Sequence, residues 1–220
     1  MVREDSGITK LEQLDGKGYS LGIVGSGSEF ICKTAVEASG IKPDVYVGSF
    51  TDAVDACKDN RVVGFAKALS GQFLDASMLD VQAVTPIHII SLTEEQIAGA
   101  TRAIPGIVPV TLPANSLENY RDGKHPAINV IGYMSGETAT SRISQDLGYK
   151  MWRAVIDHWD ELVEAYLKAK GFDPLRDSMS IMVEVSKVTT PPPFHAGMVQ
   201  IFEENGIQVP QSLIPPEYKR

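Results

Sequence analysis

Short β-prone runs alternate with helical stretches through the first half of the chain. The β-prone runs are apolar and cover 19–24, 45–47, 62–68 and 81–90. Helical patterns follow them over 29–38, 51–57, 70–78 and 94–103. Strands that alternate with helices of about ten residues favour a mainly parallel sheet with helices on both faces. We therefore expect an α/β fold.

Two of these helices carry sequence signals for their first residue. Ser49 or Thr51 is placed to cap the second helix, because a hydroxyl oxygen accepts a hydrogen bond from an unpaired N–H group of the first turn. Thr93, with Gln96 three residues later, resembles a capping box. We expect helices to begin directly after these residues.

Beyond residue 105 the pattern becomes mainly helical. Strand-like runs over 108–112 and 127–133 are separated by a polar loop. The longest helical pattern follows over 143–168, a second helix extends to about residue 187, and a last helix covers 196–204. His195 lies directly before that last helix, so we expect it to cap or to pack rather than to catalyse.

Composition excludes several functional classes. The 220 residues carry a net charge of −8, which argues against nucleic-acid binding. The four histidines are widely spaced with no i, i+4 pair, and Cys32 and Cys57 are too few for a cysteine metal cluster or a disulfide scaffold. No apolar run approaches the roughly 18 residues of a membrane helix. We predict no metal and no cofactor.

The most informative stretch is the turn Gly25-Ser26-Gly27-Ser28, followed by Glu29. A strand that ends in such a turn and continues as a helix leaves several backbone N–H groups unpaired, and the helix dipole adds partial positive charge there. Small side chains let a ligand approach the backbone. The turn is therefore a candidate anion or carboxylate site, and an ordinary glycine turn before a capped helix is the alternative.

Two enzyme motifs fail at this turn. A dinucleotide fingerprint needs a third glycine, but Ser28, Glu29 and Phe30 follow instead. A nucleophile elbow needs the spacing Gly-x-Ser-x-Gly, which is absent from 24–28. Because no other catalytic constellation stands out, we predict that the chain is not an enzyme.

Several ordered motifs resemble one family of bacterial solute receptors. The segment Ile8-Thr-Lys-Leu-Glu-Gln-Leu-Asp-Gly-Lys17 is similar to their lead-in, and the turn at 25–29 resembles their Gly-Ser-Gly-Thr-Glu turn. Further similar stretches are Asp52–Asp59, Leu112–Ser116, Pro193–Ile207 and Ser212–Lys219. Together they resemble the TAXI family, the receptors of one branch of the tripartite ATP-independent periplasmic (TRAP) transporters.

The resemblance implies a type II periplasmic-binding-protein fold with a ligand held between two α/β lobes. Residues 8–135 would form one complete ligand-binding lobe, and residues 136–220 the hinge and the C-terminal helices of an incomplete other lobe. Family members carry a further segment ahead of the lead-in, so we expect the N-terminal part of the first lobe to be absent. The segment Val63–Gly71 also departs from the family pattern.

The function implied is an extracytoplasmic or periplasmic receptor that delivers a small carboxylate-bearing solute, an amino acid or a dicarboxylate, to TRAP membrane subunits. Besides the turn at 25–29, we expect the carboxyl ends of the parallel strands to line the site. The residues there are Ser49, Ala68, Leu69 and Ser70. Two alternatives remain: a binding module outside transport that is truncated or forms homo-oligomers, and a small-molecule enzyme on the same fold.

Overall fold

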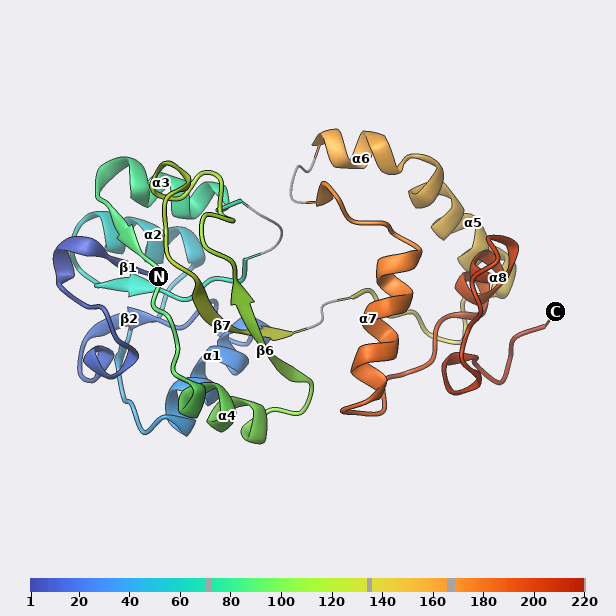
Figure 1. Cartoon of the computed structure of the whole chain (residues 1–220), viewed down its shortest axis with the longest axis horizontal. Coiled ribbons are helices and arrows are strands. Elements are labelled where there is room, and N and C mark those ends of the chain that lie inside the picture. Colours follow the sequence, from blue (N-terminus) through green and yellow to red (C-terminus); the bar gives the residue numbers. More distant parts are fainter. Residues whose placement is uncertain (70–72, 134–135, 166–168, 220) are drawn as a thin grey trace. The chain divides into compact units, whose positions relative to one another are not determined.

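The computed structural model describes residues 1–69, 73–133, 136–165 and 169–219. The chain divides into two compact units, Met1–Tyr133 and Met134–Arg220 (Figure 1). We call them unit 1 and unit 2. Unit 1 contains the strands, and the described part of unit 2 is helical.

Unit 1 is built on a five-stranded sheet with the order β3-β2-β4-β1-β5. The strands are short: β1 is Val2–Arg3, β2 Gly18–Ser20, β3 Asp44–Val45, β4 Gly64–Phe65 and β5 Ile87–His88. β2 pairs in parallel with β3 and β4, whereas β1 is antiparallel to both β4 and β5. The α/β prediction is confirmed, but the sheet is mixed because β1, which no sequence pattern indicated, runs against its neighbours.

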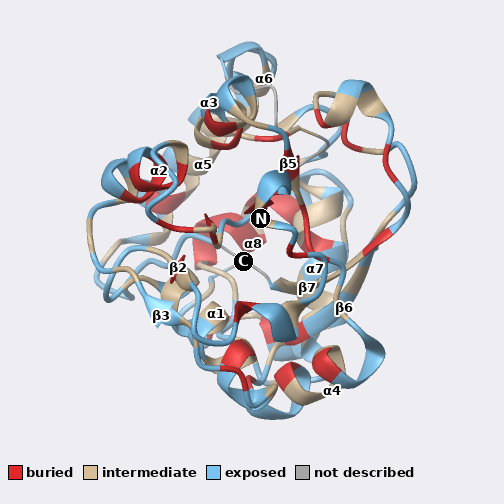
Figure 2. Cartoon of the chain, turned by 90° about the vertical axis from the view of Figure 1, so that its left-hand side faces the viewer, coloured by how far each residue is buried: buried red, intermediate tan, exposed pale blue. Residues whose placement is uncertain are grey.

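Helices cover both faces of this sheet. α2 (Phe50–Lys58) and α3 (Ala76–Val84) pack together on one face, and α1 (Gly27–Ala38) and α4 (Glu94–Ala103) pack together on the other (Figure 1). Figure 2 shows buried positions interspersed with exposed ones along these helices, as expected for helices with one apolar face. The core on the α2 side includes Phe65, and the core on the α1 side includes Val2 and Tyr19.

Two predicted elements between residues 70 and 90 were wrong. The helix expected over 70–78 is α3, which begins at Ala76, and 70–72 lie outside the described residues. Asp75 fixes this start, because its side chain accepts a hydrogen bond from Met78 N at 3.1 Å. The strand expected over 81–90 is instead the end of α3 followed by β5. Val81 has a β-branched side chain but is fully buried in the helix, so packing overrides its propensity.

A long hairpin completes unit 1. β6 (Ile107–Leu112) and β7 (Ile128–Tyr133) pair antiparallel along their full length, which confirms both predicted strands. The loop between them contributes Tyr120, whose hydroxyl accepts from Ile89 N at 3.2 Å and donates to Ile87 O at 3.3 Å. This side chain therefore ties the loop to the end of β5.

The described part of unit 2 contains four α-helices. They are α5 (Gln145–Asp157), α6 (Trp159–Ala165), α7 (Arg176–Ser186) and α8 (Ala196–Glu204). α5, α7 and α8 contribute side chains to one apolar cluster. The cluster contains Val199, Ile201 and Phe202, which are fully buried. The helix expected over 143–168 is interrupted at His158, and 166–168 lie outside the described residues, whereas the helix predicted over 196–204 is confirmed.

α5 and α8 approach each other backbone to backbone. A Cβ atom added at Gly197 would lie 2.2 Å from Tyr149 N, so only glycine fits there. His195 caps α8, as predicted, because its Nδ1 accepts from Gly197 N at 3.1 Å. Its Nε2 then donates to Ile143 O at 3.0 Å. These contacts join the start of α8 to the start of α5.

Candidate functional site

The candidate residues of unit 1 follow three adjacent parallel strands. The carboxyl ends of parallel strands lie at one edge of a sheet, so the segments after β2, β3 and β4 begin at the same edge. The segment after β2 leads to Gly25–Glu29, the one after β3 to Ser49, and the one after β4 to Ala68 and Leu69. We call this the carboxyl edge. Ser70, the last predicted site residue, lies outside the described residues.

The turn before α1 is partly occupied by the chain's own side chains. Ser26 is the N-cap, and its Oγ accepts from Glu29 N at 3.1 Å. Gly25 adopts a left-handed φ of 79°, and its N–H donates to Glu29 Oε2 at 2.6 Å. Among the residues that the structure describes, no group accepts from the N–H of Gly27 or of Ser28. These two donors are the part of the predicted anion site that stays open.

The start of α2 is closed by contrast. Ser49 Oγ accepts from Asp52 N at 3.1 Å and donates to Asp52 Oδ2 at 2.7 Å, while Ser49 N donates to the same oxygen at 3.0 Å. These hydrogen bonds, the one from the Ser49 hydroxyl first, lower the pKa of Asp52. Ser49 caps the helix as predicted, but its hydroxyl is already used within the capping box.

The two described residues after β4 differ in their surroundings. Ala68 is exposed, and its side chain offers no polar group. Leu69 is partly buried and packs against the apolar core on the α2 side. The Ala68 side chain thus adds apolar surface, and the Leu69 side chain adds a core contact. A polar contact with a ligand at these two residues would come from their backbone groups.

Sequence reasoning missed Lys67, a cation two residues after the end of β4. Its Nζ lies 2.9 Å from Asp75 Oδ2 and 3.9 Å from the centre of the Phe50 ring. Phe50 is the first residue of α2, so the ammonium group lies beside the start of that helix. Burial disfavours ionisation of Asp75, but hydrogen bonds from Ser77 and Lys67 outweigh it and hold the pKa of Asp75 below its usual value. A lysine within the otherwise apolar run predicted as a strand over 62–68 was the signal available in the sequence.

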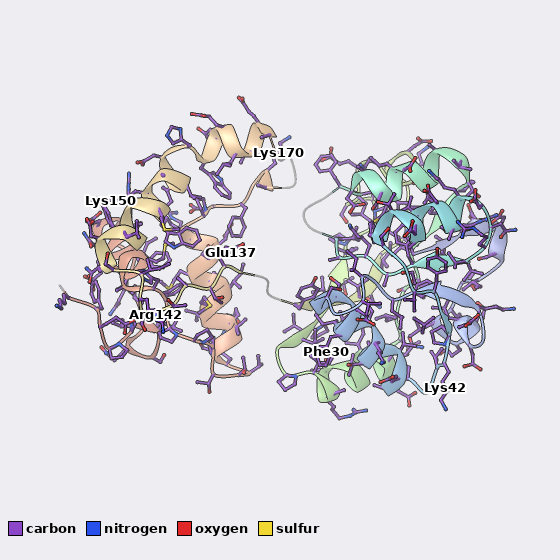
Figure 3. The ribbon with its side chains drawn as sticks, turned by 180° about the vertical axis from the view of Figure 1, so that it is seen from behind. Phe30, Lys42, Glu137, Arg142, Lys150 and Lys170 are labelled. Atoms are coloured by element: carbon purple, nitrogen blue, oxygen red, sulfur yellow. The ribbon has the colours of Figure 1, made fainter. Side chains whose placement is uncertain are left out.

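Apolar side chains are exposed around the turn before α1. Ile23, Val24 and Phe30 keep 51%, 59% and 61% of their surface accessible. Phe30, labelled in Figure 3, belongs to the first turn of α1. Three exposed apolar side chains beside open N–H donors suit a solute with an anionic group and an apolar body.

Unit 2 has a hollow of its own. Its volume is about 390 Å³, and it is lined by Gln145, Asp146, Tyr149, Gln200 and Lys219. Gln145 holds the chain end there, because Nε2 donates to Lys219 O at 2.9 Å and Oε1 accepts from Lys219 N at 3.0 Å. None of the predicted site residues lines this hollow.

Within the described ranges, no three His, Cys, Asp or Glu side chains lie close enough together to hold a metal ion. No helix in the same ranges combines the length and the apolar character needed to cross a membrane. The groups that the carboxyl edge offers for binding are the open N–H donors of the α1 start, the Lys67 ammonium group and the exposed apolar side chains beside α1.

The sequence matches a known family over most of its length. Residues 1–206 match the model of the NMT1-like family. No curated protein matches the chain. The family consists mostly of binding proteins, and its members resemble the TAXI and TRAP solute receptors. The α/β sheet with helices on both faces agrees with the periplasmic-binding-protein-like fold of that family. The chain therefore belongs to the NMT1-like family of solute-binding-like proteins.

Proposed function

We propose that this chain is an extracytoplasmic receptor that binds a small carboxylate-bearing solute at the carboxyl edge of unit 1 and delivers it to TRAP-type membrane subunits. Unit 1, which contains residues 8–133 of the expected lobe, would be the ligand-binding lobe. Membership of a solute-binding-like family supports the general function. The local geometry at the start of α1 supports the kind of ligand.

The observation that carries the proposal is the open start of α1. The N–H groups of Gly27 and Ser28 have no acceptor among the described residues, and the helix dipole adds partial positive charge at the same place. A methyl group added at Gly27 would meet no described atom within 4 Å, so an approaching ligand has space. Paired N–H donors at the start of a helix bind anionic groups, and a carboxylate is one of them.

Glu29 shapes which carboxylates fit. Its carboxylate already accepts the hydrogen bond from Gly25 N. A ligand carboxylate would therefore bind to the next unpaired donors along the chain, the N–H groups of Gly27 and Ser28. No described cation pairs with Glu29. The ammonium group of an amino acid would relieve the charge repulsion between Glu29 and a bound carboxylate.

A thermal-shift screen of the full chain against amino acids, dicarboxylates and aromatic acids tests this function. A ligand at a hundred times its Kd stabilises the fold by about 2.7 kcal/mol. We expect a shift with at least one class of carboxylate and none with the corresponding amides. The absence of any shift with all of these acids would contradict the proposal.

The Gly27→Val variant tests the position of the site. The Cβ of the new side chain would meet no described atom within 4 Å and needs no left-handed backbone, and we expect its two methyl groups to shield the open N–H groups. We expect carboxylate binding to fall by about tenfold or more, since charge-assisted hydrogen bonds are lost. Gly136→Val is the matched control, because Gly136 also has no described atom within 4 Å and lies in unit 2. If both variants bound the carboxylate with equal affinity, the carboxylate would not bind at the start of α1.

A further inference from the structure

The loop between β6 and β7 is closed by one buried histidine, His125. This residue keeps 5% of its surface exposed. Its backbone N–H donates to Asn115 Oδ1 at 3.0 Å, and its carbonyl oxygen accepts from Asn115 N at 3.1 Å. Its imidazole Nε2 accepts from Leu117 N at 2.9 Å. These three hydrogen bonds join the end of the loop to its beginning, and residues 118–124 form the tip between them.

The contacts of the imidazole fix its protonation state. Because the Leu117 N–H can only donate, Nε2 of His125 must carry a lone pair. The proton of the neutral ring is therefore on Nδ1, which donates to Pro126 O at 2.7 Å. A second proton, added at Nε2, would face the N–H of Leu117. The two donors would then repel each other, and this hydrogen bond would be lost.

A protonated His125 would also lack a negative partner. Among the residues that the structure describes, no carboxylate forms an ion pair with this ring. The Tyr120 ring lies 5.5 Å from it, and burial raises the pKa of the Tyr120 hydroxyl, so that group stays neutral. A buried cation without a partner is costly, so the closed loop favours the neutral imidazole.

The other charged groups around the loop are exposed or already paired. Glu118, Asp122 and Lys124 of the tip are exposed. The ion pairs on the elements that the loop contacts are Glu4 with Arg121, Asp75 with Lys67 and Asp80 with Lys58.

The backbone of the loop is strained. Asn115, Arg121 and Asp122 adopt left-handed φ values of 63°, 49° and 55°. In the described part of the chain, Asn60 is the one other non-glycine residue with such a backbone. Residues with a Cβ atom rarely adopt this conformation, so contacts of the loop must offset its cost. Loss of the His125 contacts would consequently favour opening of the loop.

The tip holds two other segments of unit 1. Asn119 Oδ1 accepts from Leu74 N at 2.7 Å, and Asn119 Nδ2 donates to Leu74 O at 3.2 Å. Asn119 O accepts from Gln82 Nε2 of α3 at 2.9 Å. The Tyr120 hydroxyl accepts from Ile89 N, directly after β5. The closed loop therefore fixes the segment before α3, α3 itself and the end of β5.

We infer that His125 is an acid-sensitive latch: the neutral imidazole keeps the β6–β7 loop closed on α3 and β5, and protonation of the imidazole opens the loop. Histidine is the side chain that ordinarily changes its charge between about pH 8 and about pH 5, where most carboxylates stay ionised. The closed loop is thus stable at neutral pH and loses stability as the pH falls. This inference does not depend on the proposed carboxylate site.

Hydrogen exchange of single backbone amides, measured by NMR in the full chain at about pH 7.5 and about pH 5, tests the latch. Leu117 N donates to the imidazole, and Leu74 N and Ile89 N donate to the tip. We expect the protection factors of these amides, corrected for the intrinsic effect of pH on exchange, to fall by about tenfold or more at the lower pH. Val63 N and Ala66 N, which donate to β2 in the same unit, are the control amides and should keep their protection.

Two variants identify the group that titrates. His125→Gln keeps an acceptor for Leu117 N but cannot be protonated, so its protection factors should be similar at both pH values. His88 of β5 is the other histidine of unit 1, and burial, together with the Arg121 guanidinium, lowers the pKa of His88. His88→Gln removes that group and should leave the response of the Leu117 amide to pH unchanged.

Three results would overturn the inference. If the Leu117 amide of the original chain keeps its protection at about pH 5, the loop does not open. If the control amides lose protection by the same factor, unit 1 unfolds as a whole and contains no latch. If His125→Gln responds to pH as the original chain does, or if His88→Gln no longer responds, another group controls the loop. The first two comparisons use the original chain alone, so they decide the question even if His125→Gln does not fold.

Discussion

The two units bury their interiors in different ways. Unit 1 has apolar cores on both faces of a sheet, and three segments distant in sequence begin together at the carboxyl edge. Unit 2 has a single cluster, and its helices α5 and α8 meet through Gly197 at backbone contact. The sheet edge brings together segments that follow three strands, whereas the polar hollow of unit 2 is lined mainly by the two neighbouring helices α5 and α8. Ligand binding at unit 1 is our proposal, and it uses the carboxyl edge, whereas the α5–α8 contact of unit 2 serves packing.

The two tryptophans make this comparison measurable. Trp152 and Trp159 both belong to unit 2, so tryptophan fluorescence follows the unfolding of unit 2 alone. Far-UV circular dichroism follows helices in both units. We expect each unit to unfold in its own transition as the urea concentration rises. The transition that appears in circular dichroism but not in fluorescence is then that of unit 1.

The largest expected effect is that of Phe65→Ala in unit 1. Phe65 is fully buried and contacts Phe50, so its loss should lower the free energy of unfolding of unit 1 by about 3–5 kcal/mol. The fluorescence transition should stay in place while the circular dichroism transition of unit 1 moves to lower urea. If both transitions moved together, the two units would unfold as one.

Gly197→Ala should destabilise unit 2 and leave unit 1 unchanged, the reverse of Phe65→Ala. The new Cβ would lie 2.2 Å from Tyr149 N, so α5 and α8 must separate. We expect unit 2 to lose about 3 kcal/mol, as for severe overpacking, and the fluorescence transition to move alone. Gly136→Ala, where nothing described lies within 4 Å, is the control and should leave both transitions unchanged.

Helix caps give a smaller, matched pair of effects. Ser26 caps α1 in unit 1, and Ser144 caps α5 in unit 2 by accepting from Leu147 N at 3.2 Å. Replacement of either serine by alanine should cost about 1 kcal/mol in its own unit. Urea titration with both signals checks this assignment. A loss in the other unit would show that the caps couple the units.

The smallest effect concerns the pH dependence of unit 1. The pKa of Asp75 is lower in the folded chain than in the unfolded chain, so its contribution to stability is present above about pH 4. That contribution, up to about 1 kcal/mol, is lost as the pH falls through the folded pKa. Asp75→Asn keeps a capping side chain but should flatten this part of the pH profile of unit 1. An unchanged slope would mean that Asp75 does not titrate in this range.

Local signals predicted much of the fold and part of the site. The capping box of Thr93 and Gln96 and the caps at Ser49 and His195 depend on neighbouring residues, and all three lie where the sequence indicated. The start of α3 at Ala76 was missed, because its cap, Asp75, has no Glu or Gln at the third helical position to complete a box.

The remaining misses depend on distant partners. Sequence patterns identified the turn at Gly25–Glu29 but could not show that Glu29 would occupy one of its donors. Lys67 acquires its place only because α2 brings Phe50, and α3 brings Asp75, to the same point. Such contacts between segments are set by tertiary packing, which local periodicity does not encode.

The position of β1 has a consequence for refolding. Val2 pairs with Gly64 on one side and with His88 on the other, so β1 joins two strands that lie far along the chain from it. Pairing at such sequence separation is intrinsically slow. Until β1 has paired, the edge of β4 that it covers stays open, and an open strand edge is a template for pairing with another chain. The closing of this edge is consequently the step at which refolding competes with aggregation.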